Sequence, residues 1–194
     1  MKKTTQPHME QLIVIVHGKS EWHLSKNIHS NLRIGAKVIA RDNGRSSIQI
    51  SGLCKFLQTD GRMSSISKFI KENNVYRDKT TKRLSLKIFA IMDMDDCKDE
   101  AERNAYMDGS LFNGLWQAPY IVPIYNRENL ESTMLDCGVK VEKKKDYCKI
   151  FPTNHGDIDL DAVKEFRDKV KKSKKTNLEI YLDYCIERCE KALV

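Results

Sequence analysis

Three aspartates follow a short apolar run, and they are the residues of this sequence best suited to hold a cation. Residues 88–92 are all apolar, and the run stops at Asp93, Asp95 and Asp96. A short run that is apolar throughout is typical of a strand covered on both faces, as in a parallel α/β sheet. Two carboxylates one residue apart at a strand end can turn toward one site, where their repulsion favours a shared cation or proton. The alternative is a polar turn in which the aspartates make Asx-type hydrogen bonds.

Acidic residues also follow two other predicted strands. Glu21 comes after the first strand, and Glu128 and Glu131 come after the fourth. If the strands are parallel, their carboxyl ends lie at one edge of the sheet, where ligands of open α/β proteins bind. Oxygen ligands from several loops suit Mg²⁺ or Mn²⁺, which bind one or two carboxylates directly and keep several waters. The sequence therefore predicts a divalent-metal site that includes Glu21, Asp93 and Asp95.

Apolar runs alternating with helical patterns predict the elements that position these residues. The predicted strands are residues 12–16, 36–40, 86–92 and 120–125. The predicted helices are residues 21–32, 46–57, 63–73, a helix beginning near 127, 159–172 and 178–193. The expected helix caps are Ser20, Ser46 or Ser47, Asp159 or Asp161, and Asn177. Pro123 should place the fourth strand at a sheet edge, because proline cannot donate to a strand ladder. This alternation predicts an α/β fold with a mostly parallel sheet of about four strands and a helical C-terminal extension.

Length and composition favour a single compact domain of a soluble protein. The 194 residues fit a core at residues 1–137, followed by a basic linker and C-terminal helices at 138–194 that pack on it. No run is long enough to span a membrane, and the N-terminus lacks the apolar segment of a secretory signal, so a cytoplasmic protein is expected. The six cysteines form no CxxC pair and are expected to be reduced. The net charge of +7 is compatible with a polyanionic partner, although a solvated helix face explains lysine runs equally well.

Four segments together resemble a TOPRIM domain. They are IVIVHGKSE at 13–21, GRSSI at 44–48, IMDMDD at 91–96 and RENLE at 127–131. Their order and spacing are similar to those of OLD-type nucleases and of small stand-alone TOPRIM proteins in bacterial anti-phage systems. The resemblance covers residues 12–135, and it depends on the order of motifs that are individually short. It implies a Rossmann-like core with a parallel sheet, a divalent-metal site, and nucleic-acid cleavage in many members.

The resemblance also implies roles for individual acidic residues. Asp93 and Asp95 match the paired aspartates that hold metal in this family. Glu21 matches the second glutamate of the first motif, which also belongs to the metal site. Glu131 matches the glutamate that opens the helix after the fourth strand, and Glu128 matches it less well.

His17 departs from the family's pattern. A glutamate normally precedes this glycine and acts as general base or metal ligand. An imidazole can accept a proton near neutral pH or bind Mn²⁺, but it is a poor ligand for Mg²⁺. The segment from His17 to Ser20 also has the ending of a phosphate-binding P-loop, but the earlier glycine of that motif is missing.

The leading prediction is an Mg²⁺- or Mn²⁺-dependent nuclease that cleaves DNA or RNA, as an effector of a defence system. Lys19, Arg45, Lys143 and Lys144 are expected to contact phosphates. The alternative, favoured by His17, is a catalytically weak TOPRIM module that binds nucleic acid or a partner ATPase, or forms a homodimer. A nucleotidyl-transferring enzyme of primase type would use the same metal site, although the sequence carries no added nucleotide-binding motif.

Overall fold

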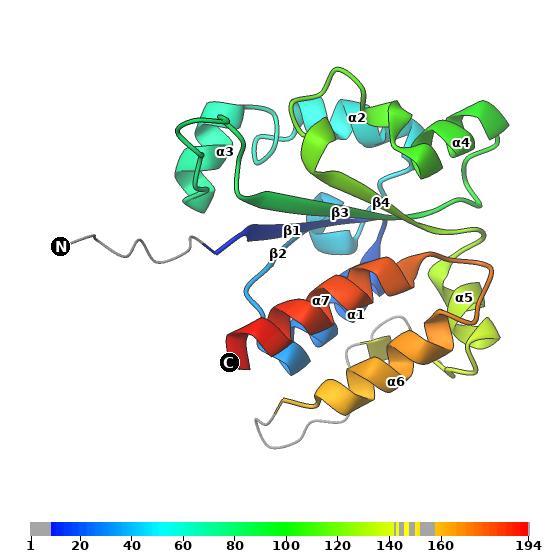
Figure 1. Cartoon of the computed structure of the whole chain (residues 1–194). Coiled ribbons are helices and arrows are strands. Elements are labelled where there is room, and N and C mark those ends of the chain that lie inside the picture. Colours follow the sequence, from blue (N-terminus) through cyan, green and yellow to red (C-terminus); the bar gives the residue numbers. More distant parts are fainter. Residues whose placement is uncertain (1–8, 142, 144–145, 148–149, 152–157, 194) are drawn as a thin grey trace.

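Four parallel strands form the centre of the molecule (Figure 1). The computed structural model describes residues 9–141, 143, 146, 147, 150, 151 and 158–193. The strands are β1 (Gln11–Val16), β2 (Lys37–Ile39), β3 (Leu86–Asp93) and β4 (Ile121–Asn126). They lie in the order β2-β1-β3-β4. This confirms the predicted α/β fold, its parallel four-stranded sheet and the edge position of Pro123 in β4.

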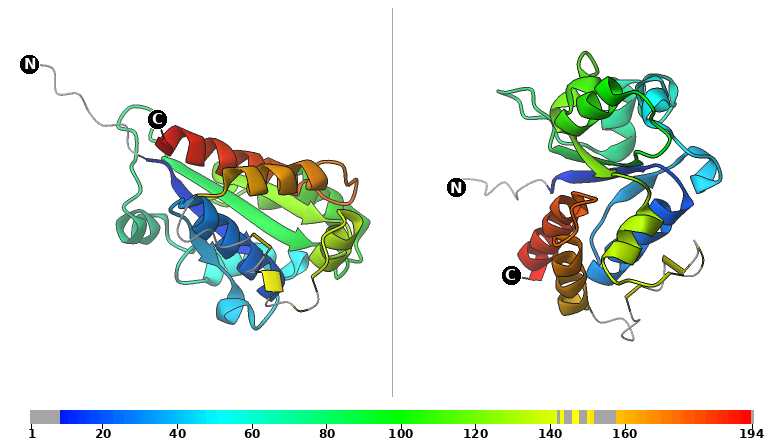
Figure 2. Two further views of the ribbon diagram at one scale, coloured as in Figure 1. Left: turned by 90° about the horizontal axis from the view of Figure 1, so that it is seen from below. Right: turned by 90° about the vertical axis from the view of Figure 1, so that its right-hand side faces the viewer.

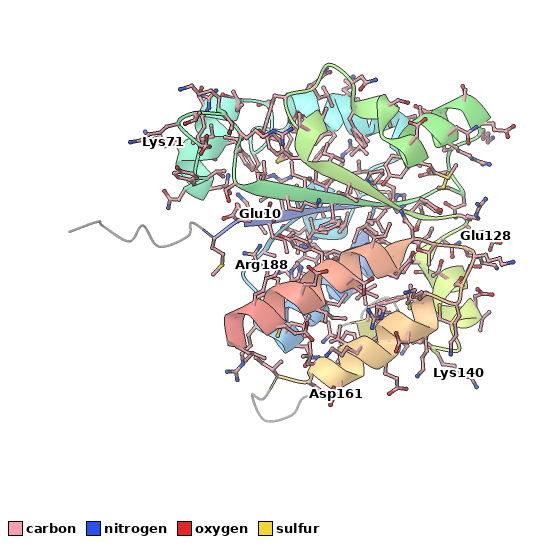
Figure 3. The ribbon with its side chains drawn as sticks, viewed as in Figure 1. Glu10, Lys71, Glu128, Lys140, Asp161 and Arg188 are labelled. Carbon is pink, nitrogen blue, oxygen red and sulfur yellow. The ribbon has the colours of Figure 1, made fainter. Side chains whose placement is uncertain are left out.

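Helices cover both faces of this sheet (Figures 1 and 2). One face is covered by α1 (Lys19–Leu32), α5 (Leu130–Asp136), α6 (Leu160–Val170) and α7 (Leu178–Leu193). The other face is covered by α2 (Ile50–Thr59), α3 (Ile66–Asn73) and α4 (Glu100–Asp108). Short 3₁₀ turns are η1 (Arg41–Gly44), η2 (Ser110–Phe112) and η3 (Ala118–Tyr120). Charged side chains such as Lys71, Lys140 and Asp161 point away from the sheet (Figure 3).

The two faces of the sheet bury different residues of the same strands. In β1, Val14 and Val16 pack toward α1 and α7, whereas Ile13 and Ile15 pack toward α2. Each fully buried aliphatic side chain contributes about 1.5–3 kcal/mol through removal of its surface from water. Burial on both faces is the reason that the strand sequences are apolar throughout rather than alternating. Because α7 shares a core with β1 and contacts β4, this helix packs directly on the sheet, and α6 packs on α7 and α1.

Several helices begin at a different residue from the one predicted. Helix α1 has Gly18 as its N-cap, two residues before the predicted cap Ser20. The Ser20 hydroxyl instead donates to Glu131 Oε1 at 2.7 Å, so a long-range partner replaces the local one. Helix α2 is capped by Gln49 rather than by Ser46 or Ser47. Helix α3 starts at Ile66 after the cap Ser65, because residues 60–64 form a separate turn.

Of the two caps predicted for the C-terminal helices, one is confirmed and one is corrected. Asp159 caps α6, and its side chain accepts a hydrogen bond from the backbone N–H of Ala162. The side chain of Asn177, in contrast, pairs with the edge strand β4. Its Oδ1 accepts from the Tyr125 N–H at 2.8 Å, and its Nδ2 donates to the Pro123 carbonyl at 3.0 Å. Asn177 therefore satisfies backbone groups that an edge strand would otherwise leave open.

Two general properties of the described residues concern membrane-spanning helices and disulfide bonds. Within the residues that the structure describes, the helices are too short or too polar to cross a bilayer. The five described cysteines are all free thiols, and the sixth, Cys148, lies outside the described residues.

Candidate metal centre

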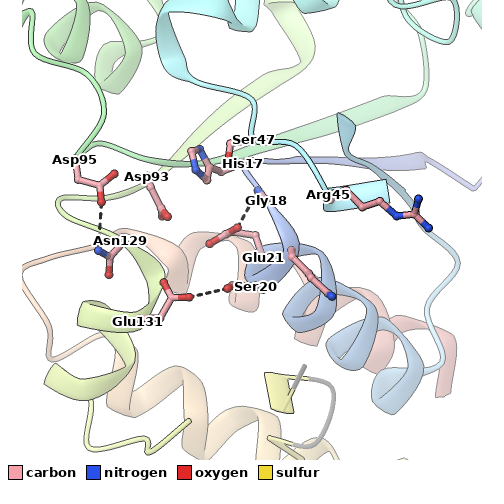
Figure 4. Close-up of a pocket in the computed structure, with 12 residues that line it drawn as sticks. His17, Gly18, Ser20, Glu21, Arg45, Ser47, Asp93, Asp95, Asn129 and Glu131 are labelled. Atoms are coloured by element: carbon pink, nitrogen blue, oxygen red, sulfur yellow. Dashed lines mark hydrogen bonds between the residues drawn. The ribbon is translucent and has the colours of Figure 1, made fainter. Parts of the chain in front are cut away.

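The sheet has a crevice at the carboxyl ends of β1 and β3. The chain leaves β1 toward α1 on one face and leaves β3 toward α4 on the other, with β2 and β4 on opposite flanks. Such a reversal of strand order is where open α/β sheets bind ligands. A cavity of about 510 Å³ lies at this edge. Its lining (Figure 4) is His17, Gly18, Lys19, Ser20, Glu21, Gly44, Arg45, Ser47, Asp93, Asp95, Asn129 and Glu131.

Four of the predicted acidic residues reach this cavity, and they come from three parts of the fold. Glu21 comes from the first turn of α1, Glu131 from the first turn of α5, and the two aspartates from the end of β3. Figure 4 shows the carboxylates of Asp93, Glu21 and Glu131 turned toward a common space. Glu128 does not line the cavity; one of its oxygens lies 3.5 Å from Lys175 Nζ. Of the two glutamates considered in RENLE, the structure thus brings Glu131 to the site.

Asp93 and Asp95 differ in burial but are each held by an asparagine. Asp93 is the last residue of β3 and is only 5% exposed, and its Oδ1 accepts from Asn126 Nδ2 at 2.9 Å. Asp95 is exposed, and its Oδ2 accepts from Asn129 Nδ2 at 3.2 Å. These hydrogen bonds fix the direction of each carboxyl group.

Glu21 has one oxygen with a structural role and one without a partner. Its Oε2 accepts the Gly18 N–H at 2.9 Å and so completes the first turn of α1. Its Oε1 is buried and has no hydrogen-bond partner within the described structure. A buried polar atom of this kind costs free energy unless a ligand, water or proton satisfies it. The capping bond to Gly18 therefore explains the position of only one of the two carboxylate oxygens of Glu21.

Burial and neighbouring carboxylates raise the pKa values of Asp93 and Glu21. Burial, followed by the nearby charge of Glu21, raises the pKa of Asp93 to about 9, although the Asn126 hydrogen bond opposes this rise. Burial likewise raises the pKa of Glu21, with a further contribution from the charge of Glu131. A cation in the cavity would oppose both shifts, because it favours the charged form of each group.

The arrangement suits a hydrated ion rather than a closed cage. Within the described residues, no three Asp, Glu, His or Cys side chains are arranged so that they could hold one ion together. Mg²⁺ is commonly bound through one or two carboxylates and keeps several waters. The carboxylates of Asp93 and Asp95 suit the direct contacts, and the unpartnered Oε1 of Glu21 suits a bond to one of the waters.

His17 lines the cavity directly after β1, and its surroundings select one tautomer. Its Nδ1 lies 3.0 Å from the carbonyl oxygen of Ile48, which can only accept a hydrogen bond. Nδ1 must therefore carry the hydrogen, and Nε2 keeps a lone pair in the neutral ring. Asp96 Oδ2 lies 3.9 Å from the same Nδ1. The His17 ring can thus accept a proton or bind a metal through Nε2.

Two of the four predicted phosphate-binding residues line the cavity. Lys19 and Arg45 are exposed there, and Figure 4 shows Arg45 across the cavity from Asp95. Gly44 allows their segments to meet: it has a φ of +83°, and a Cβ at this position would lie 3.1 Å from Lys19 Cα. Lys143 is exposed but does not line the cavity, and Lys144 lies outside the described residues.

Four polar residues of this region were not identified as site residues from the sequence. Ser20, Ser47 and Asn129 line the cavity, and Asn126 holds Asp93 from behind it. Ser47 and Asn129 lie within the GRSSI and RENLE segments, so their neighbourhood could have indicated them. Nothing local marks Asn126 or the bond from Ser20 to α5, since both depend on distant segments.

The cavity therefore combines carboxylate oxygens, which are of the kind that bind cations, with two nearby cationic side chains, a combination that suits a phosphorylated ligand. A scan against protein-family models and searches of curated proteins and of solved structures found no match for this chain.

Proposed function

We propose that this protein is a TOPRIM-like nuclease that cleaves phosphodiester bonds of DNA or RNA with Mg²⁺ or Mn²⁺. The observation that carries the proposal is the meeting of four carboxylates in one cavity that also contains Lys19 and Arg45. A phosphodiester substrate needs both kinds of group, because its phosphate is anionic and its cleavage develops further negative charge on oxygen.

In this proposal Asp93 and Asp95 hold the ion directly, and Glu21 and Glu131 complete its surroundings, in part through water. The buried Glu21 Oε1 supports this assignment, because it has no partner within the described structure. When bound, such an ion activates a water molecule and neutralises charge on the leaving oxygen.

The other residues of the cavity have distinct roles in the same proposal. His17 accepts a proton from the attacking water through Nε2, which its bond to Ile48 leaves available. Lys19 and Arg45 bind the phosphate groups that flank the cleaved bond. Ser20 keeps Glu131 in place by its 2.7 Å hydrogen bond between α1 and α5.

Nucleic-acid binding through Lys19 and Arg45 should depend strongly on salt. Each phosphate contact releases counterions, so the log–log slope of affinity against salt should be about −0.9 per contact on duplex DNA and about −0.7 on single strands. The double variant Lys19→Ala with Arg45→Ala should bind more weakly and have a slope shallower by about 1 to 2. Fluorescence anisotropy with labelled single- and double-stranded DNA and RNA, at several salt concentrations, measures both quantities.

The matched control for this prediction is Lys55→Ala with Lys71→Ala. These lysines are exposed on α2 and α3, helices that lie on the other side of the sheet from α1 (Figure 1), and their removal changes the net charge equally. If both double variants weaken binding alike, the interaction depends on overall charge rather than on this cavity. No binding by the wild type at low salt would leave Lys19 and Arg45 as solvated side chains.

A second candidate is a binding module with little or no catalytic activity. Two observations favour it: His17 stands where the resemblance leads one to expect a glutamate, and no three described side chains form a ready-made metal site. Such a module would bind nucleic acid or a partner ATPase through the same face.

Cleavage by His17 variants distinguishes the two candidates. If His17 supplies the base or a metal ligand, the wild type should prefer Mn²⁺ to Mg²⁺, and His17→Ala should lower the rate by about 10²-fold while leaving binding nearly unchanged. His17→Glu should raise activity with Mg²⁺. The assay is cleavage of labelled DNA and RNA with each metal from pH 5 to 9.

The cleavage activities of the wild type and the two His17 variants decide between the two candidate functions. An inactive wild type together with an active His17→Glu variant would identify a binding module that has lost its base. If neither the wild type nor either variant cuts any substrate with either metal, the nuclease proposal is wrong.

A further inference from the structure

A buried chain of hydrogen bonds connects Asp93 to two other parts of the molecule. Asp93 and Asn126 are register partners on the adjacent strands β3 and β4, and Asn126 Nδ2 donates to Asp93 Oδ1 at 2.9 Å. On its other side, Asn126 Oδ1 lies 3.2 Å from Thr133 Oγ1 in α5 and 3.1 Å from Thr176 Oγ1 before α7. The exposed fractions of Asn126, Thr133 and Thr176 are 0%, 0% and 6%. Water therefore does not compete for these bonds.

The two hydroxyls determine which way the Asn126 amide points. An amide oxygen accepts and an amide nitrogen donates, so an oxygen facing two hydroxyls leaves the nitrogen facing Asp93. The Thr176 hydroxyl has one hydrogen, and the Tyr125 carbonyl lies closer to it, at 2.7 Å. The Thr133 hydroxyl is thus the more effective donor to Asn126. With the amide turned the other way, two oxygens would face each other at Asp93.

Backbone contacts bring Thr176 to this position. Residues Asn126 and Thr176 form an antiparallel bridge, and the Arg127 N–H donates to the Lys175 carbonyl at 2.7 Å. The Leu178 N–H in turn donates to Thr176 Oγ1 at 3.1 Å. The segment between α6 and α7 is therefore attached to the end of β4, directly behind the cavity.

We propose that Asn126 is a positioning residue for the metal centre, oriented by Thr133 and supported by Thr176, and that the C-terminal segment is thereby part of the site. The inference rests on the proposed metal site and adds the residues that hold its most buried ligand. The Asn126 bond occupies Oδ1 of Asp93 and leaves Oδ2 for the ion. Hydrogen-bond partners behind metal ligands typically change metal affinity by about 10- to 100-fold when they are removed.

The test is the affinity of the full chain for Mn²⁺ alone, measured from the electron paramagnetic resonance signal of free Mn²⁺. Thr133→Val keeps the shape of the side chain but removes the donor, so Mn²⁺ affinity should fall by about tenfold. Thr133→Ser restores a hydroxyl and should recover most of this loss. Asn126→Leu removes the whole connection and should have the larger effect, up to about 100-fold.

Ile28→Val provides the matched control for stability. Ile28 is fully buried in the same core, and its truncation typically destabilises a protein by about 0.5–1.5 kcal/mol without touching the hydrogen-bond chain. Its Mn²⁺ affinity should equal that of the wild type. A merely structural role for Thr133 would give the same unchanged affinity.

The possible outcomes separate this inference from the proposal on which it rests. If the wild type binds Mn²⁺ and Thr133→Val binds it equally well, Asn126 is not oriented by Thr133 and the inference is overturned, while the metal site stands. If the wild type binds no Mn²⁺, the metal site and the inference are both overturned. Because Thr133→Val is a conservative change, this test does not depend on whether Asn126→Leu folds.

Discussion

Replacing Asp93 and Asp95 by asparagine should abolish metal-dependent cleavage, with a fall in rate of about 10³-fold or more. Asparagine has nearly the same shape as aspartate but carries no charge, so the two side chains would no longer attract the ion. Loss of several kcal/mol of charge stabilisation in the transition state corresponds to this change in rate. Single-turnover cleavage of labelled DNA and RNA, with saturating Mn²⁺ and enzyme, measures the effect on the chemical step.

Binding of nucleic acid should survive in the same double variant. Measured without metal, the variant has fewer carboxylates that can repel phosphates, so affinity should be unchanged or higher. The matched control is Asp161→Asn with Glu187→Gln, which removes two exposed charges from α6 and α7. This control should cleave at the wild-type rate. Wild-type cleavage by the Asp93 and Asp95 variant would exclude both residues from the chemistry.

Asp93→Asn alone should make the metal-free protein more stable at alkaline pH. The pKa of Asp93 is raised from 3.8 to about 9 in the folded protein, chiefly by burial and then by the charge of Glu21. Between these two pH values the folded state holds a proton that the unfolded state releases. The contribution of Asp93 to the free energy of unfolding should therefore be greatest at about pH 4 and below. This contribution should be lost as the pH rises toward 9. Asparagine removes this pH dependence, so the free energy of unfolding of Asp93→Asn should exceed that of the wild type by on the order of a few kcal/mol at pH 8.

Urea unfolding with a chelator at pH 5 and pH 8 tests this prediction. Asp95→Asn is the control, because Asp95 is exposed and its charge is stabilised by water. Mn²⁺ at a hundredfold excess over its dissociation constant should stabilise the wild type by about 2.7 kcal/mol and Asp93→Asn by much less. If Asp93→Asn is destabilised at pH 8 as much as at pH 5, then folding does not raise the pKa of Asp93.

Much of the fold follows from local patterns in the sequence. The apolar runs of β1 and β3 predict central strands because both of their faces are buried, and the structure places them side by side. Pro123 marks an edge strand because it lacks an N–H group, and β4 is indeed at the edge. Parallel pairing then brings the residues that follow β1 and β3 to one end of the sheet. The meeting of Glu21 with Asp93 depends only on this geometry.

The details of the site could not be predicted from local patterns. Ser20 is a favourable helix cap in isolation, yet its hydroxyl bonds Glu131, 111 positions away. The direction of Asp93 depends on Asn126, whose own orientation depends on threonines from α5 and from the segment before α7. Such bonds form only after the sheet and helices have packed. Sequence spacing therefore indicates which residues reach the cavity but not what holds them there.

The carboxylates that follow β1 and β3 are proposed to bind a divalent metal ion. Anomalous diffraction from crystals soaked in Mn²⁺ tests it most directly, because the signal locates the ion independently of the surrounding atoms. The account predicts an anomalous peak in the cavity, about 2.0–2.3 Å from carboxylate oxygens of Asp93, Asp95 or both, and no such peak in Asp93→Asn with Asp95→Asn. Absence of a peak at saturating Mn²⁺, or a peak that none of the four carboxylates approaches, would contradict it.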